Sequence, residues 1–153
     1  MKRLIFVFLI LLLQLVGCMN SNYGPNIDML NLDISYLSYG KPVLLISDYE
    51  EFKTQISNHE ELKNIDEEFF VSHDLLCILV SSNAEEYNNK IQFKSVELIN
   101  DEWNFTFSSR IEDDATDLAF FLTSFNFKVS KSLDIKEENI KIIKNRIIEK
   151  ESD

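Results

Sequence analysis

The stretch DLLCILVSS, residues 74–82, contains six consecutive apolar residues between Asp74 and Ser81. The run is too short for most helices. A strand that is apolar at successive positions sends apolar side chains to both of its faces, so both faces need to be covered. The stretch therefore predicts a central strand of a sheet. Cys77 lies inside the run, and we expect it to behave as a small buried hydrophobe rather than as a catalytic thiol.

Upstream of this stretch, the sequence predicts two short strands and one helix. A break at Gly40-Lys41-Pro42 separates the segment ISYLSY, 34–39, from the apolar segment 43–46, and both segments are strand candidates. Asp48 is placed to cap a helix, and Glu51 stands three positions later, as in a capping box. Tyr49, Phe52 and Ile56 follow at helical spacing, so the helix should pack this stripe on the core.

Downstream of the central strand, alternating residues predict further strands. Residues 90–99 alternate imperfectly, which indicates a bulge near Ser95. A turn at Asn100-Asp101 leads into 102–109, and residues 121–130 alternate again. The Ile-rich segment 139–150 favours a strand, although a helix stays open. The expected fold is α+β, a mainly antiparallel sheet of about five to seven strands with one helix packed on it.

The N-terminal stretch LIFVFLILLLQLVGCMN, residues 4–20, has the order of features of an export signal. Lys2 and Arg3 precede ten consecutive apolar residues, 4–13. A membrane span would need about 20 apolar residues, and Gln14 interrupts the run. Export is therefore expected rather than spanning.

The segment Leu15-Val16-Gly17-Cys18 resembles the lipobox of bacterial lipoprotein signals. The resemblance implies that the Cys18 thiol receives a diacylglyceryl group, that a peptidase cuts before it, and that fatty chains such as palmitate hold the protein on the outer face of the cell membrane. An ordinary secretory signal is the alternative. The expected organisation is a signal peptide at 1–17, the lipidated cysteine and a linker at 18–27, and a single globular domain at 28–153.

The charge of the chain limits its partners. The formal net charge is −11 at pH 7, and loss of Lys2 and Arg3 with the signal would make it about −13. Nucleic acids and anionic headgroups favour Lys and Arg clusters, so we expect no nucleic acid partner. Membrane contact is expected through the lipid anchor, and the expected partner is an envelope protein. No motif for a cofactor or a catalytic nucleophile is present.

Two groups of residues are candidate sites. Glu112, Asp113, Asp114 and Asp117 form an acidic loop that is either simply solvated or a weak site for a cation such as Ca²⁺. Trp103, Phe105 and Phe107 alternate along one strand and either belong to the core or form an interaction patch. His59 and His73 are expected at the surface, with no metal site.

A broader resemblance involves four segments: Asp66–Phe70, LLCILV at 75–80, Thr116–Phe121 and Val129–Lys131. Together they resemble a group of uncharacterised exported domains of Gram-positive bacteria and, more distantly, the accessory subunit of a surface protease complex. The resemblance implies a domain that supports an enzyme without being one. We therefore expect a lipid-anchored, non-catalytic accessory or binding module, with a small hydrolase or inhibitor-type protein as the alternative.

Overall fold

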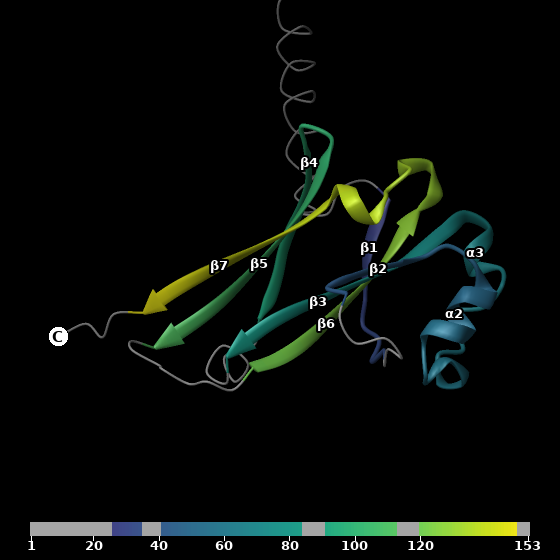
Figure 1. Ribbon diagram of the computed structural model, residues 1–153, viewed down its shortest axis with the longest axis horizontal. Coiled ribbons are helices and arrows are strands. Elements are labelled where there is room, and N and C mark those ends of the chain that lie inside the picture. Colours follow the sequence, from purple (N-terminus) through teal and green to yellow (C-terminus); the bar gives the residue numbers. More distant parts are fainter. Residues whose placement is uncertain (1–25, 35–40, 84–90, 113–119, 150–153) are drawn as a thin grey trace, which may run out of the picture.

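The computed structural model describes residues 26–34, 41–83, 91–112 and 120–149, which form two β-sheets and a small helical layer (Figure 1). The four-stranded sheet has the order β1-β6-β3-β2, and the three-stranded sheet has the order β4-β5-β7. The strands are β1 (Ile27–Leu30), β2 (Val43–Ile46), β3 (His73–Asn83), β4 (Gln92–Ile99), β5 (Glu102–Glu112), β6 (Phe120–Ser130) and β7 (Ile140–Glu149).

The helices are short. The α-helices are α2 (Tyr49–Gln55) and α3 (Phe69–Ser72), and the 3₁₀ turns are η1 (His59–Glu61), η2 (Lys131–Leu133) and η3 (Glu137–Asn139). Figure 1 shows the three-stranded sheet at the left and α2 and α3 at the right, with β3 and β6 between them. Within the described ranges, no helix is both long enough and apolar enough to cross a membrane.

The prediction of a sheet-dominated α+β fold is confirmed, but the strands differ from a single mainly antiparallel sheet. They divide into two sheets, and β7 runs parallel to β5, with Trp103 opposite Ile140. The chain leaves β6 through η2 and η3 before β7 begins, so it crosses from one sheet to the other. A parallel neighbour requires such a crossover, which the local sequence pattern does not reveal.

Strand β3 is buried on both faces, as the sequence predicts. Leu75 and Cys77 pack with the helices on one face, and both are 0% exposed. Leu76 and Ile78 pack against the second sheet on the other face, and both are also 0% exposed. A central strand that is apolar at six successive positions, 75–80, therefore separates two hydrophobic cores.

The core between the sheets is largely aromatic. The ring centroids of Phe105 and Phe127 lie 5.2 Å apart, and those of Phe93 and Phe127 lie 4.9 Å apart. Phe107 from β5 lies 4.7 Å from Phe125 of β6. These contacts join residues of the two sheets and fill the space between them.

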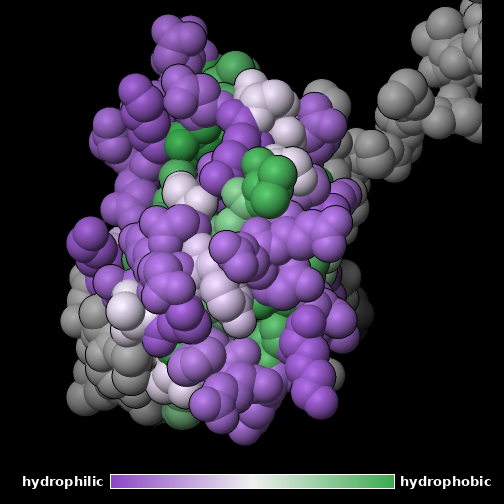
Figure 2. Space-filling model, turned by 90° about the vertical axis from the view of Figure 1, so that its right-hand side faces the viewer, coloured by the Kyte–Doolittle hydropathy of each residue, from purple (hydrophilic) through white to green (hydrophobic). Residues whose placement is uncertain are grey.

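The helical core is held by a helix that begins where the sequence predicts. The backbone N–H of Glu51 donates to Asp48 Oδ1 at 2.7 Å, and the N–H of Ser47 donates to Glu51 Oε2 at 3.3 Å. Phe52 and Ile56 are fully buried against β2 and β3. The helical side of the molecule is mainly hydrophilic, with small separate hydrophobic patches (Figure 2).

Three further local predictions are confirmed. Asn100 and Asp101 have φ values of 51° and 64°, the left-handed conformation that a two-residue hairpin turn requires. The register of β4 against β5 shifts between Phe93 and Ser95, which is the expected bulge. The Ile-rich C-terminal segment is strand β7 rather than a helix.

Candidate functional site

Most of the predicted anchor and cation-site residues lie outside the described part of the chain. Cys18, Asp113, Asp114 and Asp117 fall in ranges that the structure does not describe. Glu112 is the last residue of β5, and only its backbone is described. The lipidation site and the cation loop therefore stay predictions.

Of the two alternatives for the aromatic stripe of β5, the structure supports the core and not the interaction patch. Phe105 and Phe107 are 0% exposed in the core between the two sheets, and Trp103 is half-buried at the margin of that core. The alternation of residues along β5 correctly predicted that the three side chains lie on the same face of the strand. Because a second sheet covers that face, Phe105 and Phe107 are not available to a partner.

The two histidines lie apart, each in a local contact. His59 Nδ1 donates to the backbone oxygen of Ile56 at 3.0 Å. His73 Nδ1 lies 2.8 Å from Ser72 Oγ. Both side chains are partly exposed. Among the residues that the structure describes, no three His, Cys, Asp or Glu side chains gather as metal ligands would.

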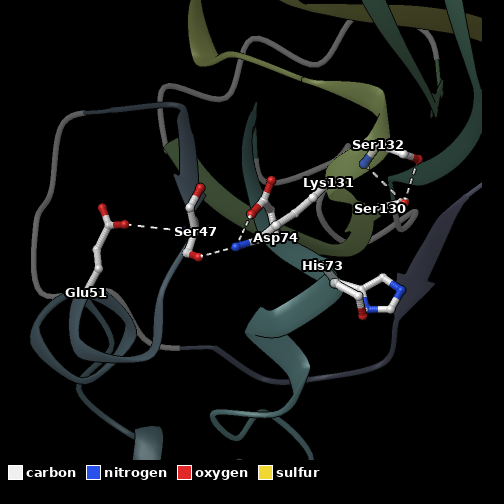
Figure 3. Close-up of polar contacts among 8 residues, drawn as sticks. Ser47, Glu51, His73, Asp74, Ser130, Lys131 and Ser132 are labelled. Carbon is white, nitrogen blue, oxygen red and sulfur yellow. Dashed lines mark hydrogen bonds and ion pairs between the residues drawn. The ribbon is translucent and has the colours of Figure 1, made fainter.

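A polar cluster that the sequence did not predict lies where β3 begins and β6 ends (Figure 3). The Asp74 side chain is 11% exposed, and Lys131 Nζ lies 3.8 Å from its Oδ1. The same ammonium donates to the backbone oxygen of Ser47 at 2.9 Å. Asp74 Oδ1 is buried, and no residue in the described part of the chain donates a hydrogen bond to it. Lys131 therefore joins the end of β2 to the start of β3 and compensates a buried carboxylate.

The cluster contains Ser, His and Asp but lacks the geometry of a catalytic triad. His73 and Asp74 are neighbours on a strand, so their side chains point to opposite faces (Figure 3). A triad needs a histidine that bonds to both the acid and the nucleophile. Instead, the hydroxyls of Ser130 and Ser132 lie 2.8 Å from each other. The contacts of Lys131 instead connect the ends of β2, β3 and β6.

A shallow groove lies at the other end of β3. Its volume is about 200 Å³, and its lining residues are Lys41, Pro42, Leu79, Ser81 and Leu122. Leu79 points to the same face of β3 as Leu75 and Cys77, beyond the part of that face that the helices cover. Leu122, opposite Ser81, is 56% exposed. The groove can accept an apolar side chain.

The pairing of Asp74 with Lys131 could have been found only from strand register. His73 lies opposite Ser130 in the antiparallel β3–β6 pair, so Asp74 and Lys131 flank the point where this ladder ends. The two residues are 57 positions apart, and no local pattern connects them.

We expect Lys131→Met to lower the free energy of unfolding by about 1–2 kcal/mol, because it leaves the Asp74 carboxylate buried without a counter-charge. The double variant Asp74→Asn/Lys131→Met should recover most of this loss. Urea unfolding of the three proteins measures both effects. The control is Lys141→Met, which removes an exposed pair with Glu102 and should cost less than about 0.5 kcal/mol. Equal losses for Lys131→Met and Lys141→Met would contradict the assignment of a buried pair.

Comparison of the chain with protein-family models, with curated proteins and with solved structures finds no significant match.

Proposed function

We propose that the protein is a lipid-anchored, non-catalytic module on the outer face of the cell membrane, where it binds and supports another envelope protein. The observation that carries the proposal is the order of features at the N-terminus: two basic residues, ten apolar residues and then Leu15-Val16-Gly17-Cys18. Two acyl chains on Cys18 would be enough for stable attachment to a bilayer.

The position of the first strand supports an orientation of the domain. Residues 19–26 would connect Cys18 to β1, and the N–H of Ser130 donates to the backbone oxygen of Asn26 at 2.9 Å. The start of β1 and the end of β6 therefore lie together at one end of the four-stranded sheet. This end would face the membrane.

The groove lies near the other end of the same sheet. Leu122 is eight residues before Ser130 on β6, which corresponds to roughly 26 Å along the strand. The groove would therefore face away from the bilayer. Leu122 and Leu79 present an apolar surface there on a strongly acidic protein, which suits an apolar side chain of a neighbouring envelope protein.

The anchor is tested by intact mass spectrometry of the protein purified from its native membrane. We expect two or three acyl chains on the wild type and none on Cys18→Ser, which should also wash off the cells. Cys77→Ala is the matched control, because Cys77 is 0% exposed and its thiol is not accessible to an acyltransferase. Its acylation should equal that of the wild type. A native protein that begins at Met1 would contradict the proposal.

The partner surface is tested by capture from detergent-solubilised membranes with the anchor intact. Leu122→Glu places a carboxylate in the apolar groove, so it should reduce recovery of the co-purifying protein at least about tenfold, since a buried unpaired charge is costly. Val71→Glu, at a 77% exposed position on α3, should leave recovery unchanged. Equal recovery of the co-purifying protein with both variants would contradict the proposal that the groove binds the partner.

A further inference from the structure

The β4–β5 hairpin carries an exposed apolar tip. Leu98 and Ile99 are consecutive residues at the end of β4 and are 55% and 48% exposed. Because neighbouring strand residues point to opposite faces, the pair places apolar surface on both sides of the hairpin. Leu98 lies opposite Trp103, which is half-buried. Exposed aliphatic side chains next to a tryptophan are typical of a surface that enters a membrane interface.

The hairpin tip lies at the same end of the molecule as the start of β1. Trp103 stands beside Ile140, the first residue of β7, and β7 follows directly from η2 and η3 at the end of β6. Ser130, the last residue of β6, is bonded to Asn26. In Figure 1 the hairpin tip and the start of β1 both lie in the upper part of the molecule, and the tip extends above the start of β7.

The tether is too short for the domain to turn away from the bilayer. Eight residues separate Cys18 from Ile27. A chain of this length reaches at most about 28 Å, even when fully extended. A globular domain of this size is roughly 35 Å across. With Cys18 anchored in the bilayer, the end that holds Ile27 and the hairpin tip would therefore stay near the membrane.

We propose that the hairpin tip rests in the interface of the same bilayer that holds the Cys18 anchor, with Leu98 and Ile99 among the upper acyl chains. This inference rests on the proposed lipid anchor. Glu97, Asp101 and Glu102 flank the tip and need water or counter-charges, and Glu102 already pairs with Lys141 at 3.7 Å. The contact is therefore shallow, with the carboxylates at the level of the headgroups. It gives the tethered domain a fixed orientation.

Trp103 is the only tryptophan of the chain and lies next to the tip, so it reports the contact directly. The experiment uses the full lipidated protein, reconstituted into phosphatidylcholine vesicles whose acyl chains carry bromine near the headgroup. We expect a loss of roughly half of the Trp103 emission, because the ring and the bromines would share the same interfacial layer. Bromine at the ends of the acyl chains should quench much less.

The variant Leu98→Asn/Ile99→Asn should lose most of this quenching while it stays bound to the vesicles. The matched control is Phe121→Asn/Ile147→Asn, which changes two exposed apolar residues at the opposite end and should be quenched like the wild type. An acylated, vesicle-bound wild type without quenching would overturn the hairpin contact and leave the anchor standing. A protein without acyl chains would overturn both proposals.

Discussion

The fold depends on the burial of β3 on both faces. Leu75 and Cys77 hold the helical layer, while Leu76, Ile78 and Val80 hold the three-stranded sheet, and none of the five is more than 3% exposed. One strand therefore belongs to two cores. Each fully buried aliphatic side chain contributes about 1.5–3 kcal/mol. The two layers should consequently form and unfold together, since neither core is complete without this strand.

The features that were predicted correctly from the sequence are local. The Asp48 cap, the Asn100-Asp101 turn and the bulge before Ser95 each depend on residues a few positions apart. The division into two sheets and the parallel β7 depend on contacts between distant segments, and alternation carries no information about them. For the same reason, the spacing of Phe105 and Phe107 predicted that both side chains lie on one face of the strand. It did not predict that a second sheet covers that face.

For the candidate sites too, local sequence patterns did not reveal contacts between distant segments. The acidic loop and the aromatic stripe were visible as compositional features, yet the polar cluster that the structure reveals joins Asp74 to Lys131 across a strand pair. The groove arises because the short helices cover only part of the four-stranded sheet. Leu79 lies at the uncovered end of that sheet, but nothing in the sequence distinguishes it from the other apolar residues of the run 75–80. In the proposed arrangement, the lipid anchor and the hairpin tip occupy one end of the domain and the groove occupies the other.

The most direct test of the shared strand is native-state amide hydrogen exchange. If β3 completes both cores, its amides from Leu75 to Val80 should exchange only through global unfolding, and they should be the slowest in the protein together with their partners on β6. The amides of α2 and β5 should then be exposed in the same global event. Exchange of β3 at a lower free energy than β5, with the three-stranded sheet still protected, would show that the sheets are independent and would contradict the account.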